Sequence, residues 1–199
     1  PSSKKSTGKR VTPPKLGKPN EHGGYLHSIA VRVLMKIMWT ANSNRWDLLK
    51  AVSVLSTHTT TWSLQDDKSL HRLMGYMKST KHLRLLGWVG DTLDCTQPHL
   101  FADADFGGDV KTQRSTTGLH IVIRGPHTSF PLTGQAKRQS CVSCSTPEAE
   151  IVAACFALRT RGLPGIRLWH TILPHKPKLL LHEDNQPMIR IMETGKNPT

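Results

Sequence analysis

A cluster of acids and glycines at residues 101–109 is the stretch of this sequence best suited to chemistry. It reads Phe-Ala-Asp-Ala-Asp-Phe-Gly-Gly-Asp and carries Asp103, Asp105 and Asp109. In an extended segment Asp103 and Asp105 share one face, and the Gly pair then ends the strand and turns the chain. Acid clusters of this kind bind metal ions or take part in catalysis. The alternative is a solvated strand end with turn-forming Asp and Gly.

Two further acids stand where secondary-structure elements are expected to begin or end. Glu150 lies in the first turn of a helix opened by Ser-Thr-Pro-Glu-Ala-Glu, and Asp184 ends a short apolar strand. If these acids and Asp103 meet at one edge of a sheet, they repel each other strongly unless cations lie between them. Oxygen ligands suit Mg²⁺ or Mn²⁺, and two such ions about 3.5–4 Å apart can clamp a phosphodiester. The expected chemistry is metal-dependent cleavage of a nucleic acid.

The charge of the chain favours the same class of substrate. Its 199 residues contain 27 Lys and Arg against 14 Asp and Glu, which gives a formal net charge of +13. This balance suits a protein that works along a phosphate backbone, and it disfavours an enzyme of small acidic metabolites. Ribosomal, histone-like and membrane-surface proteins share such a charge, so the composition predicts a nucleic-acid partner without specifying the role.

Neither the cysteines nor the apolar segments indicate secretion or a membrane. No secretory signal is found, and the cysteines follow no regular disulfide framework, so we expect an intracellular, reducing setting. The Cys-Val-Ser-Cys segment would need a second ligand pair to bind zinc, and His170 and His175 are poorly spaced for that role. The longest apolar run, residues 29–39, contains two basic residues and is too short to span a bilayer, so we expect no membrane partner. The cysteines are Cys95, Cys141, Cys144 and Cys155.

The chain divides into three predicted parts. Residues 1–24 are basic and rich in Ser, Pro and Gly, which predicts a disordered tail. Residues 25–95 are predicted to be mostly helical, with a third helix starting at Asp66-Asp67 and a possible short strand at residues 83–89. Apolar residues recur there at helical spacing in three stretches: Ala30, Val33, Leu34 and Ile37; Leu48, Ala51, Val52 and Leu55; Leu70, Leu73, Met74 and Met77.

Residues 96–199 change from a helical to an extended pattern and predict an α/β fold. Strands at 99–105, 119–123 and 129–137, separated by short loops, predict an antiparallel meander. A nearly all-apolar helix follows, interrupted at Gly162, Pro164 and Gly165 before a second helical piece. Residues 178–184 predict a short strand buried on both faces, and Asn185 caps a last helix that Gly195 ends.

Five segments of this last part resemble, in order, the motifs of the ribonuclease H domain of copia-type LTR retrotransposon Pol polyproteins. They are residues 101–109, 113–118 (Gln-Arg-Ser-Thr-Thr-Gly), 136–140 (Ala-Lys-Arg-Gln-Ser), 145–150 and 183–186 (Glu-Asp-Asn-Gln). More loosely, residues 27–90 are similar to the segment that connects reverse transcriptase to that domain. The resemblance implies a ribonuclease H-like mixed sheet, with three antiparallel strands, a helix, a parallel strand and a helix, after a mostly helical connection segment.

The resemblance also implies which residues act. Asp103, Glu150 and Asp184 match the family's metal-binding and catalytic acids, which hold two Mg²⁺ or Mn²⁺ ions. The implied reaction is hydrolysis of the RNA strand of an RNA–DNA hybrid. The 2′-OH groups distinguish the strand that is cut. The implied partners are the hybrid and the reverse transcriptase part of the same polyprotein, in a cytoplasmic particle or the nucleus.

The remaining polar residues of these motifs are given smaller roles. Asp105, Asp109 and Glu148 are expected to face outward or to cap turns. Candidate nucleic-acid contacts are Arg114, Ser115, Lys137, Arg138 and Asn185.

Departures from the family pattern leave a second function open. The family's fourth acid lies in a His- and Asp-containing segment after the last helix of this sequence, so we expect a C-terminally truncated domain. The Gly-Leu-Pro-Gly insertion at residues 162–165 interrupts a normally continuous helix. The Asp-Asp motif of reverse transcriptase is not found upstream, so we expect no polymerase activity. The alternative is a catalytically inactive polyprotein remnant that keeps a basic nucleic-acid-binding fold.

Overall fold

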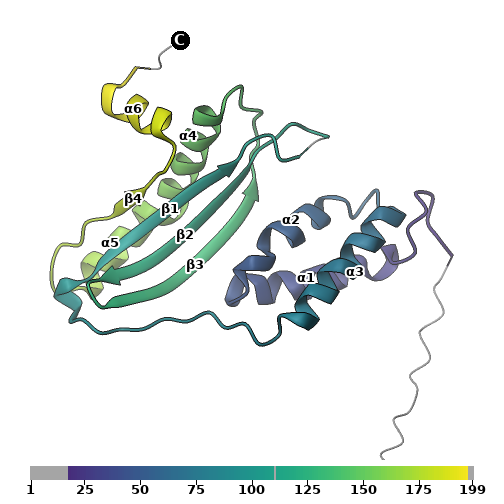
Figure 1. The fold of residues 1–199 in the computed structure, drawn as a ribbon, viewed down its shortest axis with the longest axis horizontal. Coiled ribbons are helices and arrows are strands. Elements are labelled where there is room, and N and C mark those ends of the chain that lie inside the picture. Colours follow the sequence, from purple (N-terminus) through teal and green to yellow (C-terminus); the bar gives the residue numbers. More distant parts are fainter. Residues whose placement is uncertain (1–17, 110, 197–199) are drawn as a thin grey trace, which may run out of the picture.

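The chain folds as a helical part followed by a sheet with helices packed against it, as Figure 1 shows. The computed structural model describes residues 18–109 and 111–196. The predicted basic tail therefore lies outside the described residues for its first 17 positions. Asn20, which we placed in that tail, forms a turn: its amide donates to the Trp62 carbonyl at 2.8 Å, and its side-chain oxygen accepts from the Gly24 N–H at 2.7 Å.

The helical part contains the three predicted helices. Helix α3 begins before the predicted Asp66-Asp67 start, because Ser63 caps it and Asp66 accepts in return from the Ser63 N–H in a capping box. A shared apolar core that includes the fully buried Trp62 holds the three helices together. The helices are α1 (His27–Ser43), α2 (Leu49–Thr57) and α3 (Leu64–Ser79), with a 3₁₀ turn at Trp46–Leu48 before α2.

The segment between α3 and the sheet differs from its prediction. Residues 83–89 do not form a strand; Trp88 alone makes an isolated antiparallel bridge to Ser129. Leu86 is 70% exposed, so the apolar run of this segment does not enter the core. A run of apolar residues forms a strand only where a neighbouring strand pairs with it over several residues.

The predicted meander is confirmed, and the fold is α/β with a mixed four-stranded sheet. The antiparallel strands pair in sequence, and the fourth strand pairs parallel to the first, which gives the order β3-β2-β1-β4. The strands are β1 (Gln97–Asp105), β2 (Thr116–Gly125), β3 (Thr128–Arg138) and β4 (Leu180–His182).

Strand β4 is not the doubly buried strand that its apolar sequence predicted. It has three residues, pairs only with residues 99–101 of β1, and lies at the edge of the described sheet. Leu180 is 42% exposed, because no further strand within the described range covers that edge. The apolar run indicated a strand correctly, but its burial depends on neighbours that the run does not specify.

The alternation along β1 separates the two faces of the sheet. Leu100, Ala102 and Ala104 are buried against helix α4, whereas Phe101 and Asp103 point to the other face. Helix α4 (Thr146–Ala157) starts at the predicted Ser145 cap, with Pro in its first turn. The helical part packs near β3 on the face opposite α4, where Trp46 covers Gly134.

The predicted break after α4 is a widened helical turn. The backbone stays helical through a π segment at Leu158–Gly162 and continues as α5 (Leu163–Ile172). Pro164 has no N–H to donate to the preceding turn, and the Leu163 N–H reaches the Leu158 carbonyl instead. A Cβ at Gly162 would lie 2.8 Å from the Leu179 side chain, so this glycine lets the turn approach the sheet closely.

Candidate active site

Glu150 is the most deeply buried of the predicted site acids. It lies on α4 and is only 4% exposed, and its Oε2 has no hydrogen-bond partner among the described residues. Burial raises the pKa of Glu150 to about 7, and the negative charges of Asp103, Glu183 and Asp184 raise it in the same direction. A backbone hydrogen bond from Ala104 acts against this rise. The four carboxylates are therefore close enough to interact electrostatically.

Asp103 lies where β1 and β4 separate. The last pair of these strands joins Phe101 to His182, so β4 does not cover β1 beside Asp103. On its other side Asp103 pairs with Gly118 of β2, which has no side chain. The Asp103 carboxylate is exposed there. This opening between two strands is where Glu150 and the acids after β4 come near Asp103.

Glu183 joins this group, and the sequence analysis missed it. It follows β4 directly, its Oε1 accepts from the Asn185 N–H at 2.9 Å, and its Oε2 is buried without a partner within the described structure. Burial raises the pKa of Glu183, as do the charges of Asp184 and Asp103. The available signal was its position next to Asp184, although strand alternation alone would point the two side chains apart. Asp184 itself is exposed.

The carboxylates fit a divalent cation by charge and ligand type, although they do not form a closed set of ligands. Within residues 18–109 and 111–196, no three His, Cys, Asp or Glu side chains are close enough together to hold a metal ion. Glu150 and Glu183 nevertheless each bury an oxygen without a partner, next to two more negative charges. A hard cation would satisfy such oxygens and relieve the repulsion.

Of the three acids predicted to face outward or cap turns, two hold turns and one does not. Asp105 instead pairs with Lys50 of α2. Asp109 closes a turn, where the Thr112 hydroxyl and then Arg138 lower the pKa of its carboxyl to about 2. Glu148 accepts from the Cys144 N–H at 2.7 Å, before the start of α4.

One candidate nucleic-acid contact is wrong, and others already have partners. Ser115 is fully buried, and its hydroxyl accepts from the Gly107 N–H at 3.1 Å, so it holds the turn after β1 and cannot reach a ligand. Arg138 pairs with Asp109 at 3.0 Å. Lys137 lies 4.8 Å from the centre of the Phe156 ring, and Arg114 is half-buried. Lys137 is the exposed cation of the group.

Asn185 is a helix cap, and its removal should cost stability. Its side-chain oxygen accepts from the Met188 N–H at 3.0 Å at the start of α6 (Gln186–Thr194), which Gly195 ends at a φ of 66°. We expect Asn185→Ala to lower the free energy of unfolding by about 1 kcal/mol, and Asn185→Ser, an uncharged cap, to preserve it. Urea denaturation followed by circular dichroism measures both. Equal losses in the two variants would contradict the capping role.

Two further findings concern the cysteines and the helices of the described part of the chain. All four cysteines are exposed and free. The zinc hypothesis gains no support, since no suitable ligand group is found among the described residues. Among those residues, no helix has the length and apolar character needed to cross a bilayer.

Comparison with known proteins identifies the family. The chain is 31% identical over 142 residues to secreted RxLR effector protein 161 of Plasmopara viticola, and the match covers 71% of this chain and 91% of that protein. The chain belongs to the family of that effector protein. No protein-family model and no solved structure matches it.

A second match connects this family member to a retrotransposon. The chain is 30% identical over 123 residues, 59% of its length, to the retrovirus-related Pol polyprotein from transposon TNT 1-94 of Nicotiana tabacum. The chain is therefore a retrotransposon-related protein. The match spans only 8% of the tobacco polyprotein.

Proposed function

We propose that this retrotransposon-related chain contains a ribonuclease H-like domain that hydrolyses the RNA strand of RNA–DNA hybrids. The observation that carries the proposal is the burial of Glu150 beside Asp103, Glu183 and Asp184 at the opening between β1 and β4. Repelling carboxylates with unpartnered oxygens suit divalent cations, and cation-assisted hydrolysis suits a phosphodiester. The mixed sheet, with β4 parallel to the central β1, supports the ribonuclease H-like assignment of residues 96–199.

In this proposal Asp103, Glu150 and Asp184 hold two Mg²⁺ or Mn²⁺ ions. The ions would supply an activated water and would stabilise the leaving oxygen. The protein's part is to fix the acids on a strand, a helix and a strand end. The resulting electrostatic field favours a phosphodiester only once cations are bound, because the four carboxylates alone would repel it.

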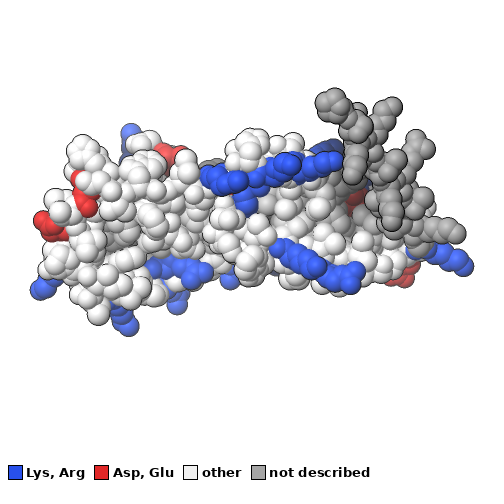
Figure 2. All heavy atoms as spheres, turned by 90° about the horizontal axis from the view of Figure 1, so that it is seen from below, with Lys and Arg blue, Asp and Glu red and all other residues white. Residues whose placement is uncertain are grey.

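Two observations support the proposed partners, namely the basic surface and the match to the tobacco polyprotein. Figure 2 shows a face on which blue Lys and Arg predominate over red acids, along both the helical part and the sheet. A surface of this sign attracts a phosphate backbone at any sequence. We propose an RNA–DNA hybrid as substrate and residues 25–95 as a connection segment beside a reverse transcriptase, in a cytoplasmic particle or the nucleus.

Cleavage of a labelled hybrid tests this function. We expect the wild-type chain to cut the RNA strand with Mg²⁺ or Mn²⁺, and Asp103→Asn to reduce the rate about 100-fold or more, because an interaction worth several kcal/mol is lost. Glu148→Gln is the matched control, since this exposed acid only caps a turn. Equal cleavage by wild type and Asp103→Asn, or no cleavage by either, would refute the enzymatic function.

One observation favours the inactive remnant as the second candidate. Among the described residues the carboxylates do not form a complete ligand group. A remnant would bind the hybrid in a gel-shift measurement and would leave it intact with either metal. That result, with binding unaffected by Asp103→Asn, would support the remnant.

A further inference from the structure

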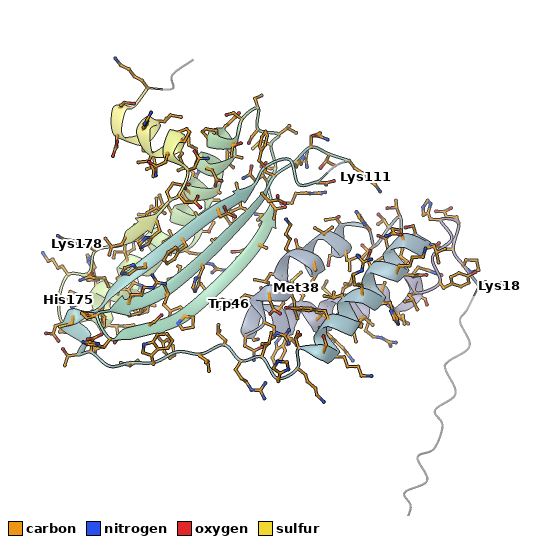
Figure 3. The ribbon with its side chains drawn as sticks, in the orientation of Figure 1. Lys18, Met38, Trp46, Lys111, His175 and Lys178 are labelled. Carbon is orange, nitrogen blue, oxygen red and sulfur yellow. The ribbon has the colours of Figure 1, made fainter. Side chains whose placement is uncertain are left out.

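A cavity of about 360 Å³ opens between the helical part and the sheet. Trp46 and Lys50 line it from the helical part, and Phe101, Asp103, His120 and Gln135 line it from the sheet. Figure 3 shows Trp46 at this junction, between the strands and the helices. The volume lies at the lower end of the range for small-molecule sites, so it suits a ligand of nucleoside size. The proposed hydrolysis does not use this cavity, although Asp103 borders both the cavity and the proposed hydrolytic site.

The walls of this cavity are aromatic. The Trp46 and His120 rings meet edge to face with centroids 5.0 Å apart, and Phe101 and His120 stack at 5.8 Å. Gly134 makes this arrangement possible, because a Cβ there would lie 2.8 Å from the Trp46 ring. Aromatic rings on a sheet and on a facing segment are the usual surroundings of a stacked base.

Two polar side-chain atoms in these walls have no partner in the described structure. Trp46 Nε1 and His120 Nε2 are both buried and unpaired. Burial, followed by the charge of Arg124, lowers the pKa of His120, so its ring is neutral near pH 7. Together they offer one indole donor and one imidazole nitrogen. Small side-chain rotations would turn these atoms toward a planar ligand whose edge carries both donors and acceptors, as every nucleobase does.

Lys50 connects the cavity to a second, basic one. The neighbouring cavity of about 240 Å³ shares Lys50 and adds Lys111 and Arg138. Lys50 and Arg138 pair with Asp105 and Asp109 in pairs that are partly exposed, and exposed pairs are weak. A phosphate could therefore replace either acid, which gives a cationic path that begins at the aromatic cavity.

We propose that the junction cavity holds one unstacked nucleobase of a single-stranded nucleic-acid segment, whose phosphates follow Lys50, Lys111 and Arg138. The inference rests on the nucleic-acid partner of the proposed function but not on cleavage. A base in this cavity adjoins Asp103, so it would anchor a strand beside the proposed site. Duplex regions cannot use the cavity, because their bases are stacked inside the helix.

Binding of short single-stranded oligonucleotides to the full chain tests this inference without cleavage. The probes are a fluorescent single-stranded DNA pentamer with a central adenine and its abasic counterpart, which carries the same phosphates, in EDTA. We expect the adenine probe to bind about tenfold more tightly. His120→Phe, which keeps an aromatic ring but removes the imidazole nitrogens, and Trp46→Leu should reduce that preference. Trp39→Leu should not, since Trp39 is 76% exposed on α1, outside the cavity. Lys50→Gln should weaken both probes alike.

Several outcomes would overturn the inference. Equal affinity of wild type for the two probes would do so, and so would an unchanged preference in both Trp46→Leu and His120→Phe. Thermal unfolding of each variant identifies a folding defect, and His120→Phe, which is similar in size to the wild-type side chain, then decides. A chain that discriminates between the probes but cuts no hybrid would support the base site and refute the proposed enzymatic function. A chain that cuts the hybrid but binds both probes equally would refute the base site and support the enzymatic function.

Discussion

At about pH 8, without divalent metal, Glu150→Gln is expected to unfold about 4–8 °C above the wild-type chain. The reason is the raised pKa of Glu150, about 7 in the folded state against 4.5 as its ordinary value. Below pH 4.5 Glu150 is protonated in both the folded and the unfolded state, so its burial causes no loss of stability. As the pH rises toward 7, the unfolded state releases its proton first, so wild-type stability falls and stays low above pH 7. After allowance for screening by solvent, the loss is about 2 kcal/mol.

Differential scanning calorimetry between about pH 4.5 and 8 measures this effect. The wild-type midpoint should fall relative to that of Glu150→Gln across this interval, and the two should converge at its acid end. Glu148→Gln on the same helix is the control and should follow the wild type, because Glu148 is exposed. Mg²⁺ or Mn²⁺ should raise the wild-type midpoint at the alkaline end and should leave Glu150→Gln almost unchanged. Parallel profiles of wild type and Glu150→Gln would contradict the raised pKa of Glu150 in the folded state.

Replacing Trp62 by alanine is expected to lower the free energy of unfolding by about 3–5 kcal/mol. Trp62 is fully buried in the core shared by α1, α2 and α3. Its indole N–H donates to Asp67 at 2.7 Å, and the same carboxylate accepts from the Tyr25 and Leu26 N–H groups. The substitution would leave a cavity and would remove one donor from a buried carboxylate.

Urea denaturation followed by circular dichroism is the measurement, with the midpoint compared at an unchanged m-value. Trp39→Ala is the matched control, because the same side chain is removed from a position that is 76% exposed. Its effect should lie within about 0.5 kcal/mol of zero. Similar losses in the two variants would contradict the role of Trp62 as the centre of the helical core.

Most of the elements could be predicted from local patterns. The apolar spacing in α1 and the alternation in β1 each repeat with the period of one backbone geometry, which neighbouring residues suffice to define. The Ser145 and Asn185 caps act within one helical turn, so they too were readable. The widened turn at Leu158–Gly162 was misread, because Pro164 and Gly162 suggest a break unless the packing of Leu179 is known.

The sequence by itself determined the three predicted acids and the strand, helix and strand end that carry them. Only the tertiary structure decided that Glu183 joins them, that Ser115 is buried, and that β4 is an exposed edge. The junction cavity belongs to this second class, since Trp46 and His120 are distant in the chain. Burial and the repulsion of charges depend on which distant segments pack together, and local periodicity carries no information about that packing.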